Sequence, residues 1–67
     1  MSVAKVSEIT ASSTVSFDDA VKVGIARASK TLKNIKGAWI NEQTVEVANG
    51  EVKSYRVNMK VTFVLDD

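Results

Sequence analysis

Asn49 and Gly50 stand between two runs of alternating apolar and polar residues, and this dipeptide constrains the fold more than any other feature of the sequence. A two-residue type I′ turn needs a positive φ at both central positions, which Asn and Gly tolerate, so the pair predicts a β-hairpin. With these two residues as the loop, every residue of the incoming strand has a defined partner on the outgoing strand. The predicted pairs are Ala48 with Glu51, Gln43 with Arg56, Asn41 with Asn58, and Trp39 with Lys60.

The predicted register gives the hairpin one apolar face and one polar face. Every second residue of the last strand is apolar, which gives the row Tyr55, Val57, Met59, Val61, Phe63 and Leu65. Side chains alternate between the two faces of a strand, so this row is expected to cover the core. The incoming strand is predicted to add Ala38, Ile40, Glu42 and Thr44 to the same face. The opposite face is predicted to carry Trp39, Asn41, Gln43, Arg56, Asn58, Lys60 and Thr62.

Residues 17–34 are predicted to form one amphipathic helix, because apolar residues recur there at steps of three and four. Ser16 precedes the first turn and is a good N-cap, since its hydroxyl can accept a free backbone N–H. Gly24 falls within the apolar stripe, where a glycine costs about 1 kcal/mol relative to alanine. We therefore expect another backbone to approach the helix closely at Gly24. Residues 34–37 are expected to end the helix.

Residues 3–10 alternate loosely and are rich in Val, Ile and Thr, which predicts a strand, and residues 11–15 are expected to form a loop. The resulting order is strand, helix, strand, strand. This order predicts a two-layer α+β fold in which a three-stranded antiparallel sheet packs on one amphipathic helix. A chain of 67 residues leaves no room for a second domain, so we expect a single domain over residues 1–67.

A chain this short and this apolar, with 45% hydrophobic residues and no cysteine, is difficult to stabilise alone. Below about 70–80 residues, one core seldom supplies more than ~3–5 kcal/mol, and small folds usually need a staple or a partner chain. Without cysteine there are no disulfides. One sheet face is left uncovered by the predicted helix. We therefore expect the chain to associate with copies of itself.

The composition argues against several classes of function. The sequence has no His and no Cys, which removes the commonest general base and the commonest zinc ligand, so we expect neither an enzyme nor a protein metal site. The carboxylate pair Asp66–Asp67 is expected to be solvated, and it is an alternative place for a divalent cation if a neighbouring chain adds oxygen ligands.

Charge and hydropathy give no sign of a nucleic-acid or membrane partner. The net charge is +1, and the local cluster of Lys22, Arg27, Lys30, Lys33 and Lys36 is typical of a solvated helix face, with anion binding as the alternative. No apolar run approaches the ~20 residues that a membrane span needs. The first residues lack the apolar region of a signal peptide, so we expect a cytoplasmic protein.

Trp39 is the only tryptophan and the most informative candidate residue. On a polar sheet face it has two interpretations. In the first, Trp39 lies in a subunit interface, because indoles are enriched in interface hot spots. Alternatively, it is a stacking platform for a planar ligand, with hydrogen-bond donors from Gln43, Arg56, Asn58 and Lys60. The two interpretations are compatible if the ligand lies at the interface.

The segment VAKVSEIT over residues 3–10, the helix from Ala20 to Ala28 and the strand from Tyr55 to Phe63 resemble the dodecin family. The resemblance covers nearly the whole chain. It implies a βαββ fold and a hollow spherical homo-dodecamer. It also implies that flavins (FMN, riboflavin or FAD) bind in antiparallel pairs at two-fold contacts, between Trp side chains of two subunits. The role that it implies is flavin storage or buffering rather than turnover.

The sequence departs from the family pattern at two positions. Without gaps, the family's stacking Trp falls on Gly37, and Trp39 stands on the same strand face, one pleat repeat or roughly 6–7 Å away. The family's flavin-contacting Gln falls on Arg56, which can donate to a flavin carbonyl or phosphate but cannot accept from the ring N–H. The flavin site implied by the resemblance consists of Gly37, Trp39, Gln43, Arg56 and Asn58.

Some relatives that lack the Trp are described as binding calcium or other small ligands. The alternative function is therefore a dodecin-like shell that holds a different ligand, namely calcium or an anionic nucleotide-type cofactor, without flavin.

Overall fold

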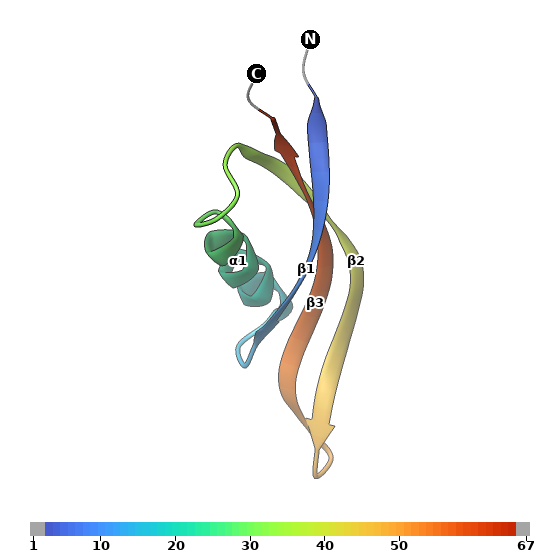
Figure 1. The fold of residues 1–67 in the computed structure, drawn as a ribbon. Helices are drawn as coiled ribbons and strands as arrows, with labels where there is room; N and C mark the ends of the chain where they lie inside the picture. The colour runs from blue at the N-terminus through green and yellow to red at the C-terminus, as the bar shows by residue number, and fades with distance from the viewer. Residues whose placement is uncertain (1–2, 66–67) are drawn as a thin grey trace.

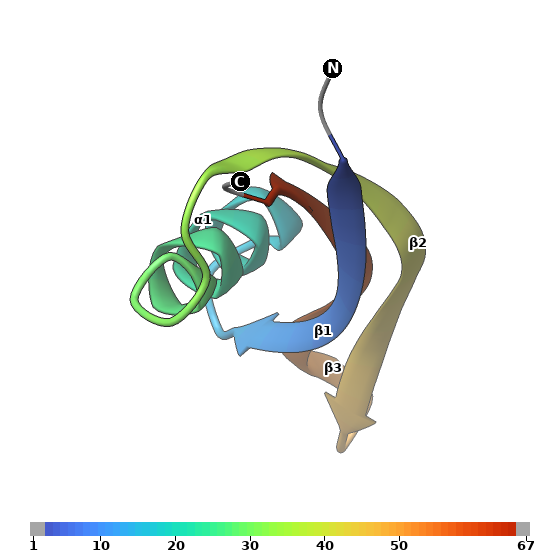
Figure 2. The same cartoon turned by 45° about the horizontal axis from the view of Figure 1, so that its top comes forward.

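The computed structural model describes residues 3–65, which form three strands and one helix. In chain order these are β1 (Ala4–Ser13), α1 (Phe17–Ala28), β2 (Ile35–Ala48) and β3 (Glu51–Val64). The strands form one antiparallel sheet in the order β1-β3-β2. The sheet curves around α1, which lies on its concave side (Figures 1 and 2). The predicted α+β class and β-α-β-β order are confirmed.

The central strand β3 supplies most of the core. The fully buried residues that pack together are Ala20, Val57, Met59 and Val61. The centre of the predicted apolar row is thus confirmed, whereas its ends are less buried. Tyr55 and Phe63 are partly buried, and Leu65 is 41% exposed. The core is small because the single helix reaches only the middle of the sheet.

The start of α1 agrees with the prediction. The Ser16 hydroxyl accepts a hydrogen bond from the Asp19 backbone N–H at 2.9 Å, which is the geometry of an N-cap. The buried Ser13 side chain ties the end of β1 to this turn, because its hydroxyl donates to the Asp19 carboxylate at 2.6 Å and accepts the Val15 N–H at 2.9 Å. The helix therefore begins where two serines together fix the connection.

The end of α1 differs from the predicted range 17–34, because the helix stops at Ala28. The Ser29 hydroxyl donates to the Ile25 carbonyl oxygen at 2.8 Å, a contact that competes with regular helical geometry. Residues 29–33 continue as turns and bends, and Asn34 takes a φ of 62° just before β2 begins. The helical spacing of apolar residues thus continues past Ala28 into a stretch where the N–H groups of Lys30, Thr31 and Leu32 still bond to the end of the helix but no regular helix follows.

The first strand is longer than predicted. The sequence assigned residues 3–10 to a strand and 11–15 to a loop, but β1 extends to Ser13. Ala11 lies opposite Val57, and Ser13 lies opposite Tyr55, so the small residues continue the ladder with β3. Their size is suited to this place, because α1 crosses directly above them.

Gly24 lies where α1 approaches the sheet most closely. A Cβ atom on this residue would lie 2.6 Å from the Met59 Cε and 2.9 Å from the Ala11 Cβ. The predicted close approach is confirmed, although side chains of two strands, rather than another backbone, make it.

We expect Gly24→Ala to lower the free energy of unfolding by about 1–2 kcal/mol, because overpacking outweighs the gain of about 1 kcal/mol in helix propensity. The Met59 methyl group can move aside, but the Ala11 Cβ is held by the β1 backbone. Denaturant titrations at one fixed protein concentration measure the effect. Val23→Ala is the matched control, since Val23 is 49% exposed on the same helix. Equal or higher stability of Gly24→Ala would contradict this packing.

The hairpin turn is confirmed, but the register beyond it is not the predicted one. Asn49 and Gly50 have φ values of 53° and 77°, and Ala48 lies opposite Glu51 as predicted. A register shift between Glu46 and Val47 then displaces the next pairs by one residue. Gln43 therefore lies opposite Val57, and Arg56 lies opposite Thr44.

A second register shift between Ile40 and Glu42 restores the predicted pairing. Trp39 lies opposite Lys60 as predicted, whereas Asn58 lies opposite Glu42 rather than opposite Asn41. Three face assignments of the sequence analysis are therefore wrong. Residues directly opposite each other share a sheet face, so Gln43 shares the face of the buried Val57, and Glu42 and Thr44 lie on the other face. The bulges are tolerated because β2 is exposed from Lys36 to Ala48, so no buried side chain of this stretch fixes its register.

Candidate ligand-binding face

Four of the five predicted site residues share the sheet face that points away from α1, called here the outer face. These residues are Gly37, Trp39, Arg56 and Asn58. Each lies opposite a residue of the neighbouring strand that is itself on the outer face. Gln43 does not belong to this group, because it lies on the helix side of the sheet opposite Val57. The predicted site residues therefore share one face except for Gln43, but they do not form one cluster, because Gly37 lies opposite Thr62, six residues along β3 from Arg56.

Trp39 lies on the edge strand β2 and remains half exposed on the outer face. The indole is 48% exposed, and the Lys60 Nζ lies 5.7 Å from its ring centroid. An ammonium group within about 6 Å of an indole centroid is attracted by the negative face of the ring. One face of the indole is therefore paired with a cation, and the ring is not enclosed by its own chain.

Asn58 links all three strands across the outer face. Its side-chain amide donates to the Thr10 Oγ1 at 3.0 Å and to the Ile9 carbonyl oxygen at 3.5 Å, both on β1. Its Oδ1 accepts from the Asn41 Nδ2 at 2.9 Å, on β2. An Asn amide has two N–H donors, and both are used here. Asn58 therefore offers a ligand one remaining acceptor site and otherwise supports the sheet.

Two further features of the outer face are open to solvent. Arg56 is exposed and lies four residues from Lys60 on β3, about 13 Å along the strand. A Cβ atom on Gly37 would meet no heavy atom within 4 Å, so a larger side chain has space at this position. The outer face therefore presents an indole with a cation over its ring, a separate guanidinium at Arg56 and open space at Gly37.

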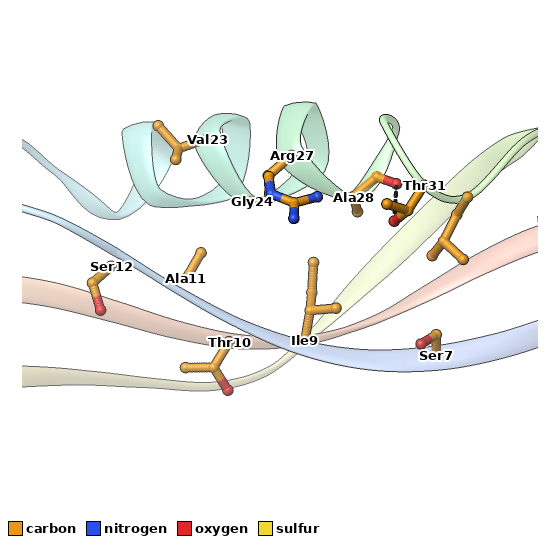
Figure 3. Close-up of a pocket in the computed structure, with 11 residues that line it drawn as sticks. Ser7, Ile9, Thr10, Ala11, Ser12, Val23, Gly24, Arg27, Ala28 and Thr31 are labelled. Carbon is orange, nitrogen blue, oxygen red and sulfur yellow. Dashed lines mark hydrogen bonds between the residues drawn. The ribbon is translucent and has the colours of Figure 1, made fainter.

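A cleft of about 500 Å³ lies elsewhere, between β1 and α1 (Figure 3). Its lining residues are Ser7, Ile9, Thr10, Ala11, Ser12, Val23, Gly24, Arg27, Ala28, Thr31 and Leu32. Ile9 and Ala11 rise from β1 toward the helix in Figure 3. None of the five predicted site residues lines this cleft. The sequence analysis did not predict this cleft, although the small residues of α1 indicate that the helix leaves space beside β1.

Within residues 3–65, no group of three or more His, Cys, Asp or Glu side chains is placed to hold a metal ion. The pair Asp66–Asp67, which the sequence raised as an alternative cation site, lies outside the described residues. α1, the helix of the described region, is not long and apolar enough to cross a membrane.

Sequence and structure are both similar to those of dodecins. The family model for dodecin matches residues 3–66. A dodecin from Streptomyces davaonensis is 33% identical with a TM-score of 0.95, and the match covers 98% of this chain and 97% of that chain. A dodecin variant from T. thermophilus is 28% identical with a TM-score of 0.95 and is matched over 100% of both chains. No curated protein sequence matches the chain.

A third similar structure is calcium dodecin from Mycobacterium tuberculosis, a calcium-chelating antigen with a novel calcium-binding site. It is 29% identical with a TM-score of 0.82, and the match covers 96% of this chain and 91% of that chain. One protein of this fold is thus described as binding calcium.

Proposed function

Because the chain belongs to the dodecin family, we propose that it is a cytoplasmic flavin-binding protein that stores and buffers flavin in a hollow homo-dodecamer. Flavin lies at two-fold contacts between subunits and stacks on Trp39. Arg56 donates to a carbonyl oxygen at the polar edge of the flavin ring, and the free Asn58 acceptor site is available to a ring N–H. The protein binds and releases its ligand without converting it.

The observation that carries this proposal is the half-exposed indole on an open sheet face. Trp is usually well buried, and an aromatic ring with a free face stacks well on a planar ligand. The outer face of one chain is open, so it covers only one side of such a ligand. A second copy of the chain is therefore needed to cover the other side. This requirement agrees with a ligand held between subunits.

A second feature supports self-association. The β2–β3 hairpin extends well beyond α1 (Figure 1), and there its helix-side face carries Val45, Val47 and Val52, called here the valine arm. These side chains are 44%, 58% and 50% exposed. A small chain with a small core gains stability when such a surface is covered. We infer that a neighbouring copy of the chain covers the valine arm.

Titration of FMN and of riboflavin with the purified protein tests flavin binding directly. Stacking on an indole quenches flavin emission, so we expect the emission to fall with added protein and to reach a plateau. Bovine serum albumin at the same concentration controls for nonspecific quenching. Unchanged flavin emission at saturating protein would contradict the proposed function.

A second candidate is a shell of the same fold that holds a different ligand, and two substitutions favour it. Gly37 stands where the family pattern has its stacking Trp, and Arg56 stands where it has Gln. A guanidinium is suited to an anion such as a nucleotide phosphate. The relative described as calcium dodecin makes calcium the other alternative. Native mass spectrometry of the protein as purified distinguishes these cases by the mass of any ligand that copurifies.

A further inference from the structure

Lys60 lies beside the indole on which a planar ligand would stack. Its Nζ lies 5.7 Å from the Trp39 ring centroid, and the two residues are directly opposite each other on β3 and β2. A ligand that stacks on this face of the indole has to take the place of the ammonium group. The ligand that binds best is therefore one that also gives this ammonium a new partner.

The ammonium is free to move when a ligand arrives. Lys60 has a charged residue on its other side, because Glu8 of β1 lies opposite it across the sheet. Its ammonium is nevertheless placed over the indole. A lysine carries its charge on a flexible four-carbon stem, so the group can swing away without any change of the backbone.

The other donors of the outer face cannot replace Lys60 beside the indole. Both N–H groups of the Asn58 amide are used within the sheet, by Thr10 and by the Ile9 carbonyl. Arg56 is about 13 Å farther along the same strand. Lys60 is therefore the cation adjacent to the stacking position.

We propose that Lys60 is a specificity-determining residue that makes the Trp39 site select flavins that carry a phosphate over neutral flavins. This inference rests on the proposed function, since it takes flavin to be the ligand. A neutral flavin displaces the ammonium from the indole and gives it no partner. A phosphorylated flavin accepts a charge-assisted hydrogen bond from the displaced ammonium, which is stronger than a neutral one.

The test compares FMN with riboflavin, which share the same ring system and differ by the phosphate. Both are titrated against the assembled wild-type protein and against Lys60→Gln. We expect Lys60→Gln to bind riboflavin about twofold to fivefold more tightly, because the competing cation–π contact is gone. We expect the same variant to bind FMN about fivefold more weakly, because the phosphate loses its charged partner. These opposite changes are a signature that general damage to the fold does not produce.

Two variants complete the experiment. Lys60→Arg keeps the cation and is expected to keep the preference for FMN. Lys5→Gln removes a charge from the helix side of the sheet, opposite Phe63, and is expected to change neither affinity. If the wild type binds both flavins equally, or if Lys60→Gln shifts both affinities in the same direction, the role of Lys60 is overturned while flavin binding stands. If the wild type binds neither flavin, both the proposed function and this inference are overturned.

Discussion

Trp39→Ala is expected to weaken flavin binding by about 10- to 100-fold, because stacking of a planar base on an aromatic side chain is worth about 1–3 kcal/mol by alanine substitution. The indole is 48% exposed, so its loss removes little of the chain's own packing. The particle should keep its size. Flavin fluorescence titration gives the affinity, and light scattering of the same samples gives the mass.

Gly37 provides a rescue experiment for this prediction. A Cβ atom at this position would meet no heavy atom within 4 Å, and Gly37 lies on the same outer face as Trp39. We expect Gly37→Trp to restore flavin binding when it is combined with Trp39→Ala, and Gly37→Ala to leave it weak. If Trp39→Ala breaks the particle in the absence of ligand and leaves flavin affinity unchanged, Trp39 is an interface anchor and not a stacking platform.

The double variant Val45→Asp/Val47→Asp is expected to dissociate the proposed assembly into small species of a few chains. Burying an unpaired carboxylate at an interface costs several kcal/mol per charge, and every copy of the chain would carry two of them. Both valines lie outside the small core, so the substitutions do not disturb the packing of Met59 and its neighbours. Because the core is small, the dissociated chain should also melt at a lower temperature. Light scattering and circular dichroism measure the two effects.

Val15→Asp is the matched control for the valine arm. Val15 is 70% exposed and lies in the connection between β1 and α1, outside the valine arm. The substitution introduces the same charge outside the arm and is expected to leave the particle intact. A full-size particle formed by the Val45→Asp/Val47→Asp variant would show that the arm is not covered by another copy.

The element order and the core could be predicted because their signals are local and strong. Asn49–Gly50 defines the turn, and the alternation along β3 places Val57, Met59 and Val61 in the core. Ser16 marks the start of α1 through its N-cap hydrogen bond. In each case the residue type has a steric or hydrogen-bonding requirement that only one local structure meets.

The register between the turn and Trp39 could not be predicted in the same way. Alternation fixes the register of a strand only where one face is buried, and β2 is exposed along nearly its whole length. The two register shifts therefore cost few contacts and have no clear signature in the sequence. They move Gln43 to the helix side and leave the Trp39–Lys60 pair as predicted, since the second shift cancels the first.

The sequence predicted that most of the candidate site residues share one sheet face, but it did not predict the contacts among their side chains. The hydrogen bonds of Asn58 to both neighbouring strands, and the place of the Lys60 ammonium over the indole, depend on rotamers that the sequence does not specify. The early end of α1 has the same origin. Ser29 caps a carbonyl oxygen of the last turn, a local hydrogen bond that competes with a continuing periodic pattern.

Native mass spectrometry after incubation with FMN tests the central claim most directly, because one spectrum reports assembly and ligand together. We expect a species with the mass of a dodecamer of the 7.2 kDa chain, and added mass in multiples of FMN. A dodecamer without added FMN mass would contradict flavin binding. A spectrum of single chains that bind no FMN would contradict the whole account.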